Sequence, residues 1–341
     1  MTSTTTFKIY LRNFPLTRWA LAIALTITAP LTIAAEVTPE SMVGAIETVF
    51  GVTPGERRNH IKGTCAAGEF VGLADAAAYT RSALFSGKAV PVVARFSLAG
   101  GNPLAPDVAK SPRGMALEFR LPNNELQHMT MLNVPVFGAA QPASFFDMFV
   151  AMKPDPATGK ADPEKMKAYK ASHPDSKPLG DFMANNNPPL SYANSAYFGI
   201  HTFKFVNRAN KTTLVRWRFV PQDGEKRLTD AELKSMPPNF LEQALITRTQ
   251  QGPLRWDMVI ALGEPGDAMD NPTVAWPADR KEVKVGTLTL SSATPQKGAE
   301  CEKINFDPLV MSDGIAPTGD PILLFRSPAY ATSFAKRING K

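Results

Sequence analysis

The order of apolar and polar positions divides the chain after residue 38 into alternating strand-like and helix-like segments. Strand-like segments combine β-branched or aromatic residues with bounding Gly, Pro or Asn. They cover 57–70, 90–98, 115–120, a run ending at 131–137, a hairpin at 197–206 and 213–220, then 253–262 and 282–291. Because short turns join successive strands, this pattern favours an antiparallel sheet or barrel.

Helical spacing of apolar residues marks a second set of segments. We predict helices at 39–50, 74–86, 142–152, 229–250 and 320–337. Residues 153–190 are rich in Lys, Asp, Pro and Asn, which is typical of surface helices and loops. No internal repeat or compositional shift splits the chain, so the sequence predicts one α+β domain over residues 36–341.

The first 35 residues have a different character. They combine a basic start, an apolar run at 19–29 and a small-residue end at Ala35, and they contain no acidic residue. This layout is typical of a cleavable secretory signal, so we expect residues 1–35 to be a signal peptide and the mature protein to be periplasmic. A retained N-terminal anchor is the alternative. No other stretch is apolar enough to suggest stable membrane insertion.

Charge excludes one class of partner. The formal net charge of +6 includes three positive residues of the first 35, which leaves a mildly basic mature chain. That chain has no Lys/Arg run, so no nucleic-acid partner is expected. Two cysteines, Cys65 and Cys301, could form a disulfide in an exported protein or remain two buried thiols.

The predicted helix at 320–337 carries candidate chemistry. Arg326, Tyr330, Ser333 and Arg337 recur at steps of four, three and four, and therefore share one face. A guanidinium one turn before a Tyr favours the phenolate, and tyrosinate is an axial ligand of haem iron in some proteins. The alternative is a solvated Arg/Lys face on a terminal helix.

Other ionisable residues are less distinctive on their own. Arg95 lies between apolar neighbours on a predicted strand, where its buried charge would need an anionic partner. His60 follows a basic pair, and an isolated His is usually a core or surface residue. His128, near a turn, and His173 are expected to be solvated.

Three separated segments together resemble the haem catalase family. They are His60 in an Arg-x-x-His-x-Lys-Gly setting, Arg95-Phe-Ser97 followed by Pro112-Arg113-Gly114, and Arg326-x-x-x-Tyr330. Further matches are His201-Thr-Phe-Lys and Phe306-Asp-Pro…Gly314-Ile. The resemblance covers roughly residues 55–337. The chain is shorter than a typical catalase, without its long arm and C-terminal helical domain, and is more similar to small exported catalase-related peroxidases.

This resemblance implies a fold and a cofactor. The fold would be a catalase-like antiparallel β-barrel of about eight strands, with helical insertions and a C-terminal proximal helix. The cofactor would be haem, of the b type, with its iron bound axially by Tyr330. Arg326 would pair with Tyr330, and His201 and Asp320 would continue a polar relay behind it. A smaller assembly than the family's tetramers, such as a homodimer, is expected.

The resemblance also assigns the other side of the cofactor. His60 would be the distal acid/base, oriented by Ser97. Phe145 would stack on the macrocycle. The haem-binding residues implied near the propionates and the proximal face are Arg57, Arg95, Ser333 and Arg337.

Some positions depart from the family pattern. Catalases place an Asn three residues before the Pro matched by Pro135, whereas this chain has Leu132 there and Asn133 one position later. An offset of one residue in a strand turns a side chain to the other face. Ser111 replaces the channel carboxylate, and Asn59 replaces a channel valine.

The expected activity follows from these comparisons. Without the distal Asn we hypothesise weak dismutation and mainly peroxidase chemistry, with hydrogen peroxide or an organic hydroperoxide as oxidant and a small organic electron donor. One alternative is a fatty-hydroperoxide lyase or isomerase, since allene oxide synthases share this fold. The others are an exported haem-binding protein and a sugar- or peptide-binding barrel without haem.

Overall fold

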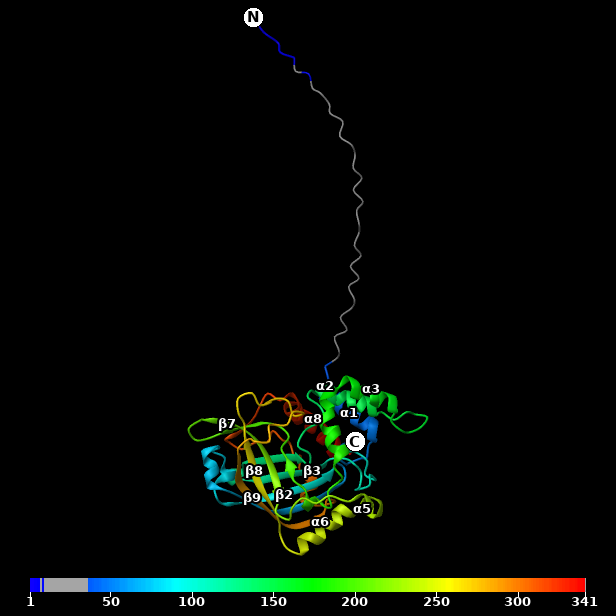
Figure 1. Ribbon diagram of the computed structural model, residues 1–341, viewed down its shortest axis with the longest axis vertical. Helices are drawn as coiled ribbons and strands as arrows, with labels where there is room; N and C mark the ends of the chain where they lie inside the picture. Colours follow the sequence, from blue (N-terminus) through cyan, green and yellow to red (C-terminus); the bar gives the residue numbers. More distant parts are fainter. Residues whose placement is uncertain (7, 9–35, 341) are drawn as a thin grey trace. The chain divides into compact units, whose positions relative to one another are not determined.

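The structure is a computed structural model that describes residues 1–6, 8 and 36–340. The predicted signal segment, apart from its first residues, therefore lies outside the described part of the chain. A compact unit begins at Glu36 and contains every helix and strand found among the described residues (Figure 1).

Eight antiparallel strands close into a barrel. They are β1 (Gly63–Gly72), β2 (Ala89–Leu98), β3 (Arg113–Arg120), β4 (Leu126–Leu132), β5 (Tyr197–Phe198), β7 (Thr212–Pro221), β8 (Leu254–Leu262) and β9 (Glu282–Pro295). The ring runs β7-β5-β4-β3-β2-β1-β9-β8 and closes where β8 pairs with β7. Two short strands, β6 (Phe203–Val206) and β10 (Ile315–Pro317), extend the sheet beside β7. The predicted barrel is confirmed.

Strand alternation gives the barrel two different faces. On β2 to β4, one set of side chains fills the core, as do Phe96, Met115 and Met129. The residues between them, such as Ser97 on β2 and Thr130 on β4, point to the outer face. This outer face of β2 to β4 forms one wall of the candidate site.

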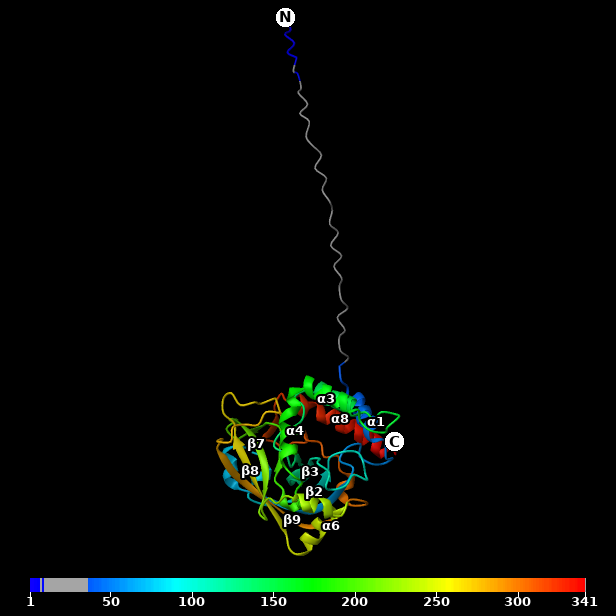
Figure 2. The same cartoon turned by 45° about the vertical axis from the view of Figure 1, so that its right-hand side comes forward.

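Helices cover that outer wall. The helices within residues 36–340 are α1 (Pro39–Phe50), α2 (Pro142–Met152), α3 (Pro163–Ser172), α4 (Lys177–Asn185), α5 (Asp230–Ser235), α6 (Phe240–Gln250), α7 (Glu300–Lys303) and α8 (Pro321–Ile338). In both views α1, α3 and α8 gather at one end of the unit, away from α6 (Figures 1 and 2). Glu47 of α1 bonds Lys336 of α8 at 2.7 Å, so the first and last helices are joined.

The predicted boundaries are mostly correct, and Pro explains two differences. The helices at 39–50 and 142–152 are confirmed. The helix predicted over 229–250 is two helices, because Pro237 and Pro238 cannot donate the backbone bonds that a continuous helix needs. Strand β4 ends at Leu132, before Pro135, rather than at 137. Residues 74–86 form two short 3₁₀ turns, at Ala74–Ala78 and Ala83–Phe85.

A disulfide joins Cys65 of β1 to Cys301 of α7, with their Cα atoms 5.6 Å apart. Both residues are buried in a small apolar cluster with Val93 and Phe306. The bond therefore fixes α7 and the segment after it against the outer face of the barrel. Among the described helices, none combines the length and apolar character needed to cross a bilayer.

Candidate active site

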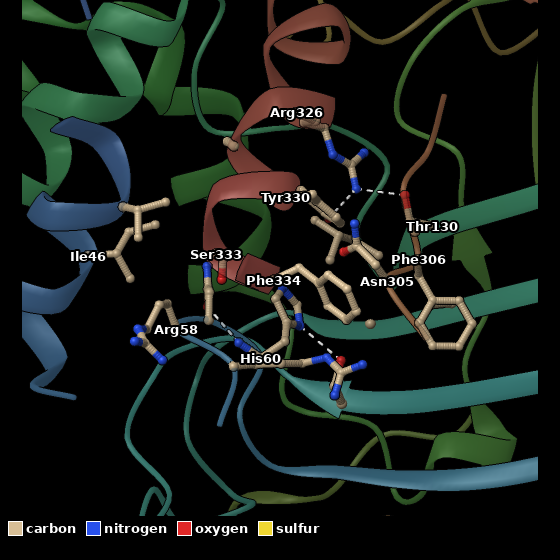
Figure 3. A pocket seen from close by; sticks show the side chains of 18 of the residues that line it. Ile46, Arg58, His60, Thr130, Asn305, Phe306, Arg326, Tyr330, Ser333 and Phe334 are labelled. Carbon is tan, nitrogen blue, oxygen red and sulfur yellow. Dashed lines mark hydrogen bonds between the residues drawn. The ribbon is translucent and has the colours of Figure 1, made fainter. Parts of the chain in front are cut away.

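A cavity with an empty volume of about 1400 Å³, including space open to solvent, lies between the outer face of β2–β4 and helices α1, α2 and α8. Figure 3 shows it from close by. Most of the candidate residues line it: Arg57, His60, Arg95, Ser97, Phe145, Arg326, Tyr330, Ser333 and Arg337. The other two, His201 and Asp320, lie directly behind Arg326. Residues from both ends of the domain thus meet in one cavity.

A continuous hydrogen-bonded chain leads to Tyr330. Asp320 caps α8, and its second oxygen lies 2.6 Å from His201 Nδ1. An ionised carboxylate accepts, so Nδ1 carries the proton and Nε2 accepts from Arg326 Nη1 at 3.1 Å. Burial lowers the pKa of His201 against the pull of Asp320, which keeps the ring neutral.

Arg326 connects this hydrogen-bonded network to the phenol of Tyr330. Its Nη2 donates to Tyr330 Oη at 2.7 Å, and the guanidinium lies over the ring with Cζ 5.3 Å from its centroid (Figure 3). The spacing of four residues on α8 places the two side chains one turn apart. The phenol oxygen of Tyr330 therefore accepts a charge-assisted hydrogen bond from a fixed positive charge.

His60 provides the other reactive group of the cavity. Its Nδ1 lies 2.9 Å from Ser97 Oγ, which leaves Nε2 for the cavity. Burial, and then the charges of Arg95, Arg326 and Arg57, lower the pKa of His60 to about 3. The imidazole is therefore neutral near pH 7 and can accept a proton.

The backbone around His60 is shaped to present this ring. His60 has a φ of 55°, in the left-handed region that non-Gly residues rarely adopt. Asn59 Oδ1 supports the turn by accepting from the N–H groups of His60 at 2.8 Å and Gly100 at 2.7 Å. A Cβ on Gly114 would lie 2.7 Å from Ser97 Oγ and 3.2 Å from His60 Nδ1, so only Gly leaves room for this pair.

Three arginines form a cationic cluster in the cavity. Arg57 donates to the carbonyls of Cys301 at 3.2 Å and Ile304 at 2.7 Å. Burial and the charges of Arg95 and Arg337 lower the pKa of Arg57 to about 8. Arg337 Nη1 is buried with no partner among the described residues. Such a cluster needs an anionic ligand, because buried cations are stable only when paired.

Arg95 is buried on β2, as the sequence predicted. Its Nη2 donates to His60 O and to Gln296 Oε1, both at 2.7 Å. Arg95 therefore stabilises the turn at His60 through this backbone hydrogen bond, and it also adds a positive charge to the cluster. Among the described residues that line the cavity there are five arginines and no Asp or Glu.

The position of the distal amide is filled differently here. Leu132 lines the cavity, and Asn133 points to the other side, as the one-residue offset predicted. Asn133 bonds both backbone polar groups of Arg113, at 2.7 and 2.9 Å, and is buried. Asn133 therefore does not reach the cavity. Asn59 lines it, and its Oδ1 is engaged by the N–H groups of His60 and Gly100.

Two polar residues of the cavity were missed from the sequence. Thr130 accepts from Arg326 Nη2 at 2.6 Å, and Asn305 places an amide in the cavity wall (Figure 3). Thr130 lies on the same face of β4 as Leu132, so strand alternation could have indicated that Thr130 also faces the cavity. Asn305 directly precedes the matched Phe306, but nothing in the sequence showed that it faces inward.

The expectation for one histidine was wrong. His128 was expected to be solvated but is buried, with Nε2 3.0 Å from Glu118 Oε2 and Nδ1 3.2 Å from the carbonyl of Asp307. The reason is that the segment after α7 covers this part of β4. His173 is partly covered because its ring stacks on Tyr169 at 4.5 Å.

Comparison with known proteins agrees with this geometry. The family model for catalase matches residues 53–341. The chain belongs to the catalase family. It is 63% identical over 304 residues to a catalase-related peroxidase of Synechococcus elongatus, covering 89% of this chain and 90% of that protein. A catalase-related peroxidase of Mycolicibacterium paratuberculosis is 32% identical over 303 residues, covering 88% and 95%.

Solved catalases share the fold. A bacterial catalase aligns with a TM-score of 0.77 and 26% identity, over 84% of this chain and 58% of that one. The chain thus corresponds to somewhat more than half the length of that catalase.

The family is haem-dependent, and the cavity fits such a group. Its apolar walls, which include Phe145 and Phe334, suit a flat macrocycle. The cluster of Arg57, Arg95 and Arg337, with its orphaned Nη1, suits the two carboxylates that haem carries. No group of three or more His, Cys, Asp or Glu side chains among the described residues forms a metal site of another type.

Proposed function

We propose that this protein is a haem-dependent peroxidase of the catalase family. It reduces hydrogen peroxide, and organic hydroperoxides as well, with electrons from a small organic donor, and it works in the periplasm after export. The observation that carries the proposal is the hydrogen-bonded chain from Asp320 to Tyr330 in the same cavity as the His60–Ser97 pair.

Tyr330, Arg57, Arg95 and Arg337 would hold haem of the b type. Tyr330 would bind the iron through its phenol oxygen, and Arg326 would hold that oxygen by its hydrogen bond. The three arginines would bind the propionates. Phe145 and Ser333 would contact the macrocycle. Bound haem would supply the electrons that break the peroxide O–O bond, with iron held by a strongly donating ligand.

His60 would move the proton that this step requires. With Nδ1–H donating to Ser97 Oγ, the lone pair of Nε2 would accept the proton from one oxygen of the peroxide. The same nitrogen would then return the proton to the other oxygen, which leaves as water or an alcohol when the O–O bond breaks. The first oxygen would be reduced to water by two electrons from the organic donor and two protons. Because its pKa is lowered to about 3, the protonated ring would give this proton up readily in the second transfer.

Leu132 determines which reductant is favoured. Dismutation needs a second peroxide held in a defined orientation, and Leu132 offers it no hydrogen bond. An organic donor makes no such demand. We therefore propose mainly peroxidase turnover with weak dismutation.

An absorption spectrum tests the proposal. The mature chain supplied with hemin should give a ferric tyrosinate spectrum that peroxide changes within the mixing time. Tyr330→Phe should lose that spectrum. The matched control is Tyr169→Phe, which removes a buried phenol of α3 outside the cavity and should leave the spectrum intact. A wild-type chain that stays colourless with hemin would refute the proposal.

Further assays separate the alternatives. An allene oxide synthase-type enzyme would rearrange a lipid hydroperoxide without consuming a donor, and product analysis detects this. A haem carrier would pass its haem readily to an acceptor protein, whereas the proposed enzyme retains it. The named relatives are peroxidases and do not favour either alternative.

A further inference from the structure

Thr130 makes a contact with Arg326 that the functions assigned above do not explain. Thr130 lies on the outer face of β4, opposite Ala116 of β3. Its Oγ1 is 2.6 Å from Arg326 Nη2, the same nitrogen that donates to Tyr330 Oη at 2.7 Å (Figure 3). A guanidinium nitrogen of this kind has two hydrogens, so these two bonds account for both of them.

The guanidinium needs such support. Arg has a long side chain with several rotatable bonds, and α8 fixes only where that chain begins. His201 holds Nη1 at 3.1 Å, which is one point of attachment. With this contact alone, the guanidinium could still rotate, and Nη2 would then no longer point at Tyr330 Oη. A second contact is needed to fix its orientation. Thr130 supplies that second point from a different element, the barrel wall.

We propose that Thr130 is a positioning residue for the axial tyrosine. By accepting one hydrogen of Arg326 Nη2, it directs the other hydrogen at Tyr330 Oη and so maintains the charge-assisted bond on which the ligand's donor strength depends. This inference rests on the proposed haem peroxidase function. It gives strand β4 a role in orienting the arginine that contacts Tyr330.

A neighbouring contact provides a matched control. One residue further along α8, Ser327 Oγ bonds Asp307 Oδ2 at 2.5 Å, and the carbonyl of Asp307 is held by His128 of β4. This second link also attaches α8 to the barrel wall, but it does not touch the guanidinium. Ser327→Ala therefore tests the general effect of loosening α8, and Thr130→Val tests the specific effect on Arg326.

The experiment compares the mature protein, loaded with hemin, with Thr130→Val, Thr130→Ser and Ser327→Ala. The measurements are the ferric absorption spectrum and the rate of haem transfer to excess apomyoglobin. Thr130→Val keeps the shape but removes the acceptor. This variant should shift the tyrosinate absorption bands and increase the rate of haem loss roughly tenfold. A tenfold change corresponds to the lower end of the free energy that one hydrogen bond to a charged group contributes. Thr130→Ser should resemble wild type, and Ser327→Ala should retain the wild-type spectrum.

Two results would overturn the inference while leaving the proposed function intact: a Thr130→Val protein with wild-type spectrum and haem release, or a Ser327→Ala protein with the same spectral shift. If Thr130→Val does not fold, Thr130→Ala compared with Thr130→Ser gives the same contrast. A wild-type chain that takes up no haem would instead overturn the proposed function, and this inference with it.

Discussion

Removal of the Cys65–Cys301 disulfide should greatly destabilise the domain. The bond joins residues 236 positions apart. On the chain-entropy model a loop of that length corresponds to about 5.5 kcal/mol of stabilisation at 25 °C. Folded domains are typically stable by only about 5–15 kcal/mol, so this is a large share. The perturbation is the double variant Cys65→Ala, Cys301→Ala, which removes the bond without leaving a free thiol.

Urea unfolding of the mature protein, followed by tryptophan fluorescence, measures the effect. With a slope of about 3 kcal/mol per M, the midpoint should fall by about 2 M. Wild type treated with a reductant should match the double variant, and the variant itself should not respond to the reductant. The reasoning would be refuted if the midpoints of the oxidised wild type and the double variant agreed within about 0.3 M.

Three further changes test other parts of the site. Leu132→Asn places an amide at the position where catalases have one, and it should raise the ratio of oxygen evolution to donor oxidation. The expected increase is roughly tenfold, the value of one hydrogen bond to the second peroxide. An unchanged ratio would contradict the role given to Leu132. Arg337→Met removes a buried, partly unpaired cation, so it should stabilise the haem-free chain by roughly 1–3 kcal/mol in thermal or urea unfolding while weakening haem retention. The pKa of His60 is lowered to about 3 in the folded chain, so between pH 6.5 and 3 the unfolded chain binds a proton that the folded chain does not. The free energy of unfolding should therefore decrease as pH falls through this range, by up to about 1.4 kcal/mol per pH unit. His60→Gln should flatten this part of the stability–pH curve, and an unchanged slope would show that other groups cause it.

Local patterns predicted most of the fold, because alternation and helical spacing depend on near neighbours. The helix at 39–50 and the barrel strands are of this kind. The same rule predicted that Asn133 points away from the cavity while Leu132 faces it. The resemblance to haem catalases brought Tyr330 and His60 forward as the central pair, and the structure places both in one cavity.

What the sequence did not show depends on contacts between distant segments. His128 reads as a polar residue near a turn, and only the path of the segment around Asp307 reveals that it is buried. The role of Asn59 in holding the left-handed turn of its neighbour could not be inferred, since its second partner, Gly100, is 41 positions away. Thr130 was missed for the same reason: its partner Arg326 comes 196 positions later.

The joining of α1 to α8 has a consequence for the order of events during synthesis. The cavity needs both His60 and Tyr330, which is synthesised much later because it lies far along the chain from His60. A nascent polypeptide therefore has no complete cavity until α8 is released and docks beside α1. Under the proposed function, a haem group would therefore enter the cavity only after α8 has docked.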